Sequence, residues 1–408
     1  MSQSLPAESP INSAKLGVPG YSPARLLKSA WLVVAVFMLS NAPTPLYIHW
    51  KQQFGFSSGT LTLIFACYIL ALVFTLLVAG QLADRLGRKK VIIPGLIASV
   101  LACLCFIGAQ SIYALLAARF LTGIAVGVTV TASMAAVVDA GGESRKRQAA
   151  LVASIAMVGG AGLGPVMSGA IVRFLPHPVF TVFAVELLVQ LSAIIIALRL
   201  PPVQRIGVSA SRPLRLPSIP KKNIFHLLMG CLFFAPGLTA TSLMLSLGPV
   251  LLSHYSNAGS PVIAGIMACV MFTVAVGTQI LCRKLPISKV FYISGTALIV
   301  AMLSIIATLH GGGVKMIFIA ALASGAAQGL GQLGGLTLLS MNIAADRRAE
   351  GNALLNIGAY IPAGLLPVAT GYLMDITGMT LSFTLLASTL VTVAVIGLTI
   401  ATRQRNLG

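Results

Sequence analysis

The feature that most constrains this chain is a series of apolar runs of about 20 residues each, separated by short polar segments. A helix of that length crosses a hydrocarbon core about 30 Å thick. The runs are continuously apolar, whereas the strands of a membrane barrel alternate, so helices are predicted. Only 9% of the 408 residues are charged, against about 25% in soluble domains. The sequence therefore excludes a water-soluble globule and predicts an all-α membrane protein.

Twelve transmembrane helices in two six-helix bundles are predicted. The expected spans are roughly 29–50, 58–80, 91–110, 111–139, 149–174, 177–199, 223–252, 261–282, 290–309, 314–341, 352–374 and 380–402. They divide the chain into a tail (1–28), an N-terminal six-helix bundle (29–199), a linker rich in Pro, Arg and Ser (200–222), a C-terminal six-helix bundle (223–402) and a second tail (403–408).

The basic residues predict the orientation. Lys and Arg number 27 against 8 acids, a net charge of +19. Twenty-three of the 27 fall on one side of the predicted spans; Lys51, Arg173 and Lys315 fall on the other, and Arg119 lies inside a span. Cytoplasmic loops carry the excess of Lys and Arg. We therefore expect both tails and the linker in the cytoplasm, and the short loops favour a bacterial inner membrane. The basic charge serves orientation and predicts no nucleic-acid partner.

An internal repeat supports two related halves. A shift of 202 positions places Gly123 on Gly325 and Pro165 on Pro367. The same shift aligns Gly127 with Gly329 and Gly169 with Gly371. Two parallel six-helix repeats about an axis normal to the membrane are the architecture of an alternating-access carrier.

The loop after the second span reads Gly80-Gln-Leu-Ala-Asp84-Arg85-Leu-Gly87-Arg88-Lys89-Lys90. It resembles the signature Gly-x-x-x-Asp-Arg-x-Gly-Arg-Arg/Lys of the major facilitator superfamily. Asp84 can face the start of the eleventh span, where free N–H groups favour an anion, and Asp139 is the nearest acid for the arginines. The resemblance implies a cytoplasmic gate made of Gly80, Asp84, Arg85, Gly87, Arg88 and Asp139. The alternative is an ordinary positive-inside loop.

Two charged residues are expected inside the membrane. Arg119 belongs to Arg119-Phe-Leu-Thr-Gly123, which resembles the family's Arg-x-x-x-Gly motif and implies a role in proton coupling or substrate binding. Glu186 lies at a similar depth in the sixth span. It is interpreted either as a titrating carboxyl or as a structural partner of Arg119. Ionisable residues in the membrane are functional candidates by default. For Arg119 the alternative is snorkelling to the outer surface.

The fifth span contains Gly160-Ala-Gly-Leu-Gly164-Pro165-Val-Met-Ser168-Gly169. It resembles the family's antiporter motif, Gly-x-x-x-Gly-Pro-x-x-Gly-Gly, with Ser168 in place of one Gly. Glycines four residues apart let helices approach closely, and Pro165 removes a backbone hydrogen bond. The motif favours export, and generic helix packing by small residues is the alternative.

Polar residues in several spans are candidates for the substrate cavity: Asn41, Tyr68, Gln328, Gln332, Asn356 and Tyr360. The last four form two pairs with i, i+4 spacing, which places each pair on one helix face. Any single one can instead be an interhelical hydrogen bond.

These patterns predict a secondary active transporter, most simply a monomeric proton-coupled exporter of small amphipathic compounds. Its partners would be a small-molecule substrate, protons and the lipid bilayer. We find no sequence pattern for a cofactor, a metal site or a catalytic constellation, and expect no enzyme activity. The alternative is a carrier, or importer, of one metabolite or organic anion held by Arg119. The first span has no acid, unlike many drug/proton antiporters, and this favours the alternative.

Overall fold

The computed structural model describes residues 23–142, 145–200, 217–255, 261–344 and 347–403. The first half contains α1 (Pro23–Asn41), the 3-10 turn η1 (Thr44–Leu46), α2 (Tyr47–Phe54), α3 (Ser58–Leu86), α4 (Arg88–Ile107), α5 (Ile112–Val128), a π-helical stretch (Thr129–Ser133), α6 (Met134–Ala140), α7 (Lys146–Phe174) and α8 (Pro178–Arg199). The second half contains the 3-10 turn η4 (Lys221–Asn223), α9 (Ile224–Ser246), α10 (Gly248–Tyr255), α11 (Pro261–Cys282), α12 (Ile287–Ala307), a π-helical stretch (Thr308–Gly312), α13 (Gly313–Asn342), α14 (Arg348–Thr377) and α15 (Met379–Arg403).

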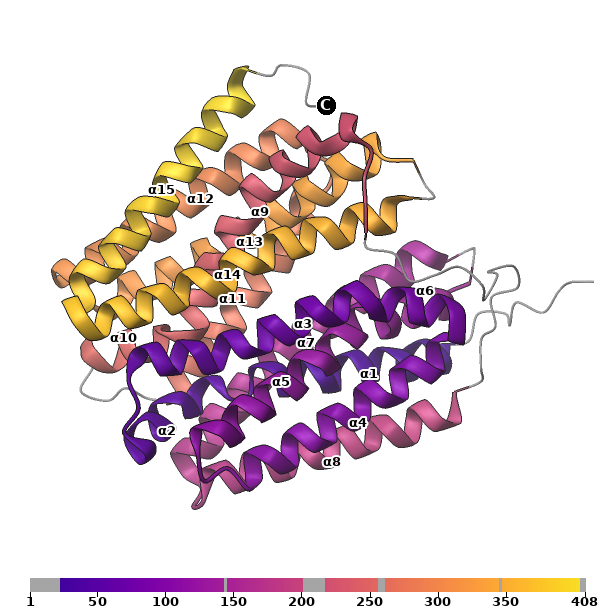
Figure 1. Ribbon diagram of the computed structural model, residues 1–408, viewed down its shortest axis with the longest axis horizontal. Helices are drawn as coiled ribbons and strands as arrows, with labels where there is room; N and C mark the ends of the chain where they lie inside the picture. Colours follow the sequence, from indigo (N-terminus) through magenta and orange to yellow (C-terminus); the bar gives the residue numbers. More distant parts are fainter. Residues whose placement is uncertain (1–22, 143–144, 201–216, 256–260, 345–346, 404–408) are drawn as a thin grey trace, which may run out of the picture.

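The two halves form two helical bundles that lie side by side (Figure 1). We call the end at which the described chain begins (Pro23) and ends (Arg403) the inner end, and the opposite end the outer end. Most of the predicted tails and linker, namely 1–22, 201–216 and 404–408, lies outside the described residues. Helix α1 starts within the segment predicted as the first tail.

The described chain has 11 helical segments that are long and apolar enough to cross a membrane. The longest of them, Ile287–Asn342, contains both α12 and α13. The backbone leaves helical geometry at His310 and Gly311, and the chain folds back, since Ser294 of α12 donates to the Ala327 carbonyl of α13. Counting α12 and α13 separately gives the twelve helices in two six-helix bundles that the sequence predicts, and this fold class is confirmed.

Local chemistry sets where the helices begin and end. Ser57 caps α3 by accepting a hydrogen bond from the Thr60 backbone N–H at 3.1 Å, which satisfies one of the donors free at a helix start. Gly55 ends α2 with φ of 63°, a conformation that favours glycine. The first span is broken, with α1 ending at Asn41 just before Pro43. Proline has no N–H to continue the helical ladder.

The sequence repeat reappears as repeated packing. Gly123 of α5 lies directly against the backbone carbonyl of Tyr68 in α3, so that a Cβ would collide there. In the second half, Gly325 of α13 lies in the same way against the carbonyl of Met271 in α11. The two glycines are 202 positions apart, and each brings its helix into close contact with the equivalent neighbour. The repeat therefore specifies the same close helix–helix contact in both halves.

The hydrophobic core differs between the two ends. Toward the outer end, one cluster of buried apolar side chains includes residues of both halves, such as Trp50 and Met244. Toward the inner end, the buried members of one cluster, such as Leu76, all belong to the first half. Two further clusters, which include Leu339 and Phe291, belong to the second half alone. The halves thus share a core at the outer end and have separate cores at the inner end.

Candidate functional site

Arg119 is buried in the first half, with 1% of its surface exposed. Its Nη1 donates to the backbone carbonyl of Ser40 at 2.8 Å. This carbonyl belongs to the last turn of α1, where carbonyls lack partners within the helix and favour a cation. Arg119 therefore caps the break in the first span. The snorkelling alternative is wrong, because the side chain does not reach the surface.

Aromatic rings surround the Arg119 guanidinium. Its Cζ lies 4.6 Å from the ring centre of Tyr68 and 5.2 Å from that of Phe65. Desolvated cation–π contacts are worth about 2 kcal/mol. The ring of Tyr47 packs edge-on against Phe65 at 6.5 Å. Among the described residues, the Nε of Arg119 and the hydroxyl of Tyr47 are buried without a hydrogen-bond partner. The site holds a positive charge with unused hydrogen-bonding capacity.

Glu186 is fully buried in α8, on a different network. Gln190 donates to its Oε2 at 3.4 Å and to the Ala35 carbonyl of α1 at 2.8 Å. Ser99 of α4 donates to Gln190 at 3.0 Å. The network therefore joins α1, α4 and α8 inside the first half. In the described chain no ion pair links Glu186 to Arg119, so the interpretation of Glu186 as the partner of Arg119 is wrong. Similar depth along two helices does not place two side chains on facing sides.

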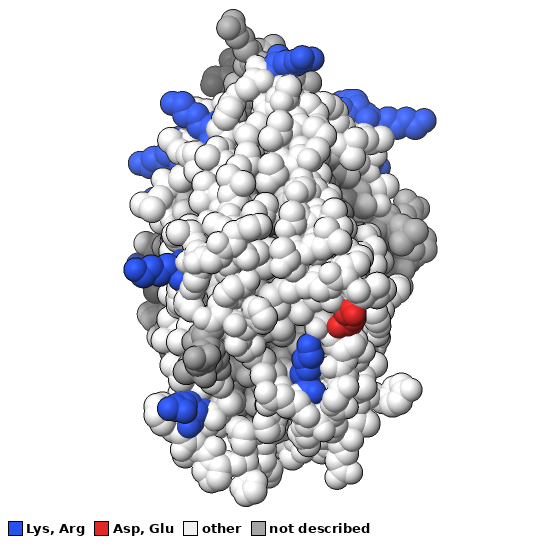
Figure 2. All heavy atoms as spheres, turned by 90° about the vertical axis from the view of Figure 1, so that its left-hand side faces the viewer, with Lys and Arg blue, Asp and Glu red and all other residues white. Residues whose placement is uncertain are grey.

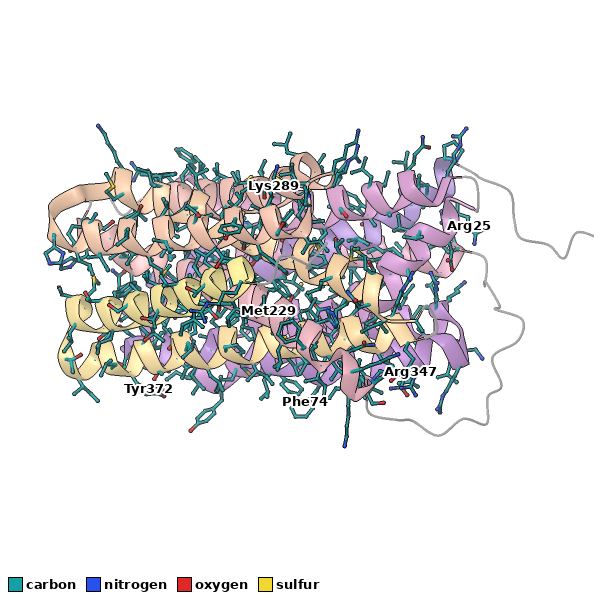
Figure 3. The ribbon with its side chains drawn as sticks, turned by 90° about the horizontal axis from the view of Figure 1, so that it is seen from above. Arg25, Phe74, Met229, Lys289, Arg347 and Tyr372 are labelled. Carbon is teal, nitrogen blue, oxygen red and sulfur yellow. The ribbon has the colours of Figure 1, made fainter. Side chains whose placement is uncertain are left out.

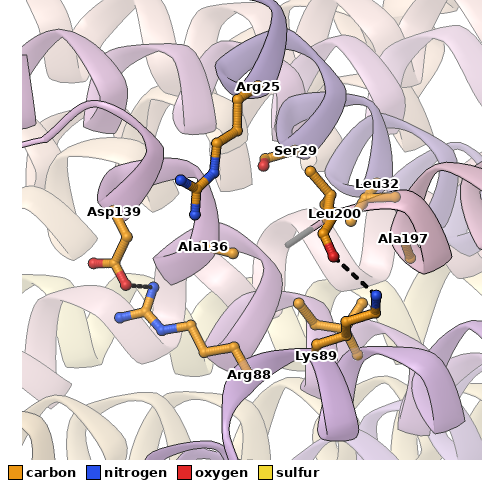
Figure 4. A pocket seen from close by; sticks show the side chains of 10 residues that line it. Arg25, Ser29, Leu32, Arg88, Lys89, Ala136, Asp139, Ala197 and Leu200 are labelled. Carbon is orange, nitrogen blue, oxygen red and sulfur yellow. Dashed lines mark hydrogen bonds and ion pairs between the residues drawn. The ribbon is translucent and has the colours of Figure 1, made fainter. Parts of the chain in front are cut away.

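The predicted gate lies at the inner end of the first half. Arg88, in the first turn of α4, pairs with Asp139 of α6, with 2.7 Å between Nη1 and Oδ2 (Figure 4). Gly87 precedes it with φ of 89°, a conformation that favours glycine, and Arg85 is half-buried beside them. The structure thus places Arg88 on Asp139, as the sequence predicts. The side chain of Asp84 lies outside the described part of the structure.

The glycines of α7 pack this helix against α1. Gly160 lies against the carbonyl of Val34, and Gly164 lies against the carbonyl of Met38. A side chain at either position would collide with the backbone of α1. Their spacing of four residues matches one helical face, the arrangement that allows close helix contact in membranes.

The rest of the same motif packs across the two halves. Gly169 of α7 lies against the carbonyl of Pro261 in α11, and Gly265 of α11 lies against the carbonyl of Pro165. These contacts join the halves toward the outer end. The antiporter motif therefore contacts α1 within its own half and α11 in the other.

A second junction between the halves involves Asp375, near the outer end of α14. Its two carboxylate oxygens accept hydrogen bonds from the backbone N–H groups of Ser58 and Gly59, at 2.9 Å and 2.8 Å. These groups belong to the start of α3, where an anion is favoured. Lys51 donates to the Ser58 hydroxyl at 2.6 Å, and the ring of Tyr372 lies against Gly59.

This junction lies toward the outer end, where Figure 3 places Tyr372, far from Arg25 and Arg347 at the inner end. Seen from the outer end, the surface is mostly uncharged, with acidic atoms beside basic ones (Figure 2). Sequence reasoning missed Asp375, because an acid near a helix end is an ordinary interface residue. The repeat places α3 on α11 and α7 on α14, so the contact of α14 with α3 is the equivalent of the contact of α7 with α11, and this was the signal that could have found it.

Tyr68 and Tyr360 are predicted cavity residues that each pack against more than one buried cluster. Tyr360 of α14 packs against buried clusters of both the first and the second half. Tyr68 packs against the shared outer cluster and the inner cluster of the first half, and its ring centre lies 4.6 Å from the Cζ of Arg119. The two tyrosines therefore lie where the shared core gives way to the separate ones.

Three of the other four predicted cavity residues form hydrogen bonds within their own half. Gln332 accepts a hydrogen bond at 3.1 Å from Gln279 of α11, a partner that sequence reasoning missed. Asn41 donates to the Ser40 hydroxyl, and Asn356 to a carbonyl of its own helix. Gln328 packs where α13 meets Gly237 of α9, and its amide oxygen is buried without a partner in the described chain. Their role as a substrate site stays a prediction.

Two further cavities lie in the described structure, one apolar and one of mixed polarity. A cavity of about 500 Å³ lies between α9, α14 and α15 and is lined almost entirely by apolar side chains, among them Leu228, Pro236 and Pro362. A cavity of about 220 Å³ lies at the outer end between the halves, with His49 and Gln52 on one side and Pro249 and Leu252 on the other. None of the predicted cavity residues lines either of these two.

The profile of the Major Facilitator Superfamily matches residues 30–314, most of the chain. The chain belongs to the Major Facilitator Superfamily. As a member of this family with helices of membrane-spanning length, it is a multi-pass membrane protein. Membership of this family indicates a transporter rather than an enzyme.

Curated relatives match the chain over a limited segment. The multidrug resistance protein MdtL of Shewanella oneidensis is 31% identical over 145 residues, which cover 34% of this chain and 35% of that protein. The chloramphenicol resistance protein CraA of Acinetobacter baumannii is 28% identical over 141 residues, 34% of each. A probable chloroplastic anion transporter 2 of Oryza sativa subsp. japonica is 34% identical over 125 residues, 28% of this chain and 23% of that protein. The alignments thus span about a third or less of each relative.

Solved structures share the whole fold. The nucleoside transporter NupG, in a mutant form, has a TM-score of 0.67 at 14% identity, covering 93% of this chain and 100% of that chain. A bacterial homologue of the human lysosomal transporter Spinster has a TM-score of 0.67 at 16% identity, covering 94% and 98%. At these identities the likeness establishes the fold alone.

Proposed function

We propose that the chain is a secondary active transporter that works by alternating access and exports small amphipathic compounds in exchange for protons. The observation that carries this proposal is the difference between the two ends. The halves share a hydrophobic core at the outer end and have separate cores at the inner end. In this reading the structure is the state that is open to the cytoplasm, and rocking of the halves reverses the arrangement.

The packing of α7 supports the rocking motion. Its glycines bring it against α1 on one side and α11 on the other. Small residues at these contacts leave no long side chains interlocked between the helices, and we infer that α7 can shift against both neighbours. Helix α7 would act as the surface along which the first half turns against the second.

Export is supported by the names of the relatives and by the antiporter-like motif. Two of the relatives described above are named as multidrug and chloramphenicol resistance proteins. The aromatic surroundings of Arg119 and the apolar linings suit compounds with few directional contacts. Glu186 is a described acid buried in a membrane-spanning helix, and we propose it as the group that exchanges a proton.

The alternative, a carrier of one metabolite or organic anion, rests on Arg119. No carboxylate pairs with this buried guanidinium in the described chain, and its Nε has no partner. A substrate carboxylate or phosphate would satisfy it. One relative is named a probable anion transporter, and one structural neighbour a nucleoside transporter.

Ethidium accumulation in efflux-deficient bacteria separates these proposals. Wild type is expected to lower the dye level, and a protonophore to abolish the effect. Glu186→Gln is expected to abolish it as well, because the amide cannot release a proton. The matched control is Glu350→Gln, the same change at an acid that bonds Ser218 at the inner end, and it should retain efflux. Expression is checked by blotting.

Each contrary result has a defined meaning. If Glu186→Gln exports normally and the protonophore still abolishes efflux, another group carries the proton. If well-expressed wild type leaves the dye unchanged, export of such compounds is contradicted. Uptake of labelled nucleosides and organic anions is then measured, and the anion alternative predicts that Arg119→Gln abolishes it.

A further inference from the structure

A pocket at the inner end of the first half gathers basic side chains around a single acid. It lies between α1, α4, α6 and the end of α8, and its charged lining residues are Arg25, Arg88, Lys89 and Asp139 (Figure 4). Three cations face one carboxylate. None of the proposed transport steps uses this pocket as a binding site.

The acid in the pocket is already neutralised. Arg88 lies 2.7 Å from Asp139, so these two charges largely cancel. Lys89 donates hydrogen bonds to the carbonyls of Leu198 and Leu200, at 2.6 Å and 2.8 Å. Its charge thereby offsets the partial negative charge at the C-terminal end of α8.

Arg25 adds a cation without a counterpart. It is half-buried on α1, and its guanidinium extends toward the middle of the pocket in Figure 4. Among the described residues, Arg25 has no hydrogen-bond or ion-pair partner. A guanidinium offers several N–H donors in a planar fork that matches carboxylate and phosphate oxygens.

Two further features suit an anion. The first turn of α4 lines the pocket through Arg88 and Lys89, and the second turn through Ile92. The free N–H groups of a helix start favour negative charge. Ser29 contributes a lining hydroxyl while only 2% exposed. The remaining lining is apolar, from residues such as Leu32 and Ala197. The pocket thus combines a basic rim, a helix start and an apolar floor.

We propose that this pocket binds the phosphate group of an anionic ligand, with Arg25 as its main contact. Lys89 and the start of α4 add positive potential, and the Arg88–Asp139 pair forms one wall. The headgroup of an anionic phospholipid and free phosphate share this chemistry. Basic pockets between membrane helices on the cytoplasmic side are suited to anionic headgroups. A bound phosphate would tie α1 to α4 and α8 at the inner end.

Thermal unfolding of the purified full-length protein tests the proposal. Wild type, Arg25→Gln and Lys28→Gln are titrated with inorganic phosphate, with dioctanoyl phosphatidylglycerol and with dioctanoyl phosphatidylcholine. Lys28 is the matched control, because it is an exposed cation on the same helix that does not line the pocket. Losing one charged hydrogen-bond partner should raise the half-maximal ligand concentration about tenfold in Arg25→Gln, and leave it unchanged in Lys28→Gln. Phosphate also stabilises proteins non-specifically, so the readout is the difference between variants.

Comparing the ligands in the titration distinguishes a phospholipid headgroup from free phosphate. A response to phosphatidylglycerol but not to inorganic phosphate assigns a lipid headgroup, and a response to both assigns a small anion. Arg25→Lys keeps the charge but loses the planar fork of N–H donors, so its half-maximal ligand concentration should lie between those of wild type and Arg25→Gln. This variant replaces Arg25→Gln in the test if Arg25→Gln does not fold. The proposal is overturned if neither ligand shifts the wild-type melting temperature, or if Arg25→Gln and Lys28→Gln weaken the response equally.

Discussion

The outer and inner ends of this molecule are held together differently, although the two halves repeat the same fold. At the outer end, buried apolar residues of both halves form one cluster, and the carboxylate of Asp375 bonds the start of α3 across the junction. At the inner end, each half has its own buried cluster. The described ion pair there, Arg88 with Asp139, stays within the first half, and Glu350 of the second half bonds Ser218 at the end of the linker.

The difference between the ends indicates which contacts stabilise one conformation relative to another. Contacts that stay within a half stabilise that half in every state of the transporter. Contacts that cross between halves stabilise only the state in which they form, because a contact must differ between two states to shift their equilibrium. Substitutions at the outer junction should therefore change the balance of states, and substitutions within a half should change stability alone.

The largest effect is expected for Gly265→Leu at the outer junction. Gly265 lies directly against the carbonyl of Pro165 in the other half, so the new side chain cannot fit while the outer end is closed. Overpacking costs about 1–3 kcal/mol or more, and we expect at least tenfold slower transport. The control is Gly277→Leu on the same helix, where a Cβ meets no atom within 4 Å. Equal loss in both variants would contradict the account.

A smaller effect is expected for Asp375→Asn. The amide keeps the shape of the side chain, but it loses the charge that favours the start of α3, and its nitrogen cannot accept one of the two backbone hydrogen bonds. The charge alone is worth about 0.5 kcal/mol for an exposed acid at a helix start, so we expect a shift of roughly twofold or more toward the state with an open outer end. The measurement is the labelling rate of a cysteine at position 49, in the outer cavity between the halves, after replacement of the native cysteines. Labelling should become faster, whereas Glu350→Gln should leave it unchanged; the reverse pattern would refute the comparison.

The smallest effect is expected for Gln279→Leu within the second half. It removes the hydrogen bond to Gln332, which in membrane proteins is worth about 0.6 kcal/mol. The free energy of unfolding should fall slightly, and the labelling rate at position 49 should stay the same. The double variant Gln279→Leu/Gln332→Leu should recover part of the lost stability, because no amide is left without a partner. A changed labelling rate would mean that this bond also differs between states.

Most of the architecture was predictable, because it follows from apolar length and from the 202-residue repeat. The glycines that align in sequence, such as Gly123 and Gly325, also occupy equivalent contacts in the structure. The ion pair at the inner end was predictable because few acids lie near the arginines there, and Arg88 does pair with Asp139. The break in the first span was not predicted, although Pro43 and Pro45 supplied a signal for it.

The candidate site was less predictable, because helical depth does not fix direction. The sequence places Arg119 and Glu186 at similar depth, but the structure directs Arg119 to the Ser40 carbonyl and Glu186 to Gln190. The Ser40 carbonyl became available through the break in α1, which is a property of the folded backbone. Asp375 was missed for a related reason, since its partners are backbone N–H groups, which carry no sequence signature.

The central claim is that the two ends open and close in alternation, and paired distances within one protein test it most directly. Spin labels at Leu86 and Leu281 report the inner end across the halves, and labels at Phe174 and Ile376 report the outer end; all four side chains are at least half exposed. The native cysteines are replaced first. Adding a transported dye or changing pH should shorten the inner distance while the outer distance lengthens, and Asp375→Asn should favour the same change. Two distances that stay fixed under all conditions, or that lengthen together, would contradict alternating access in this protein.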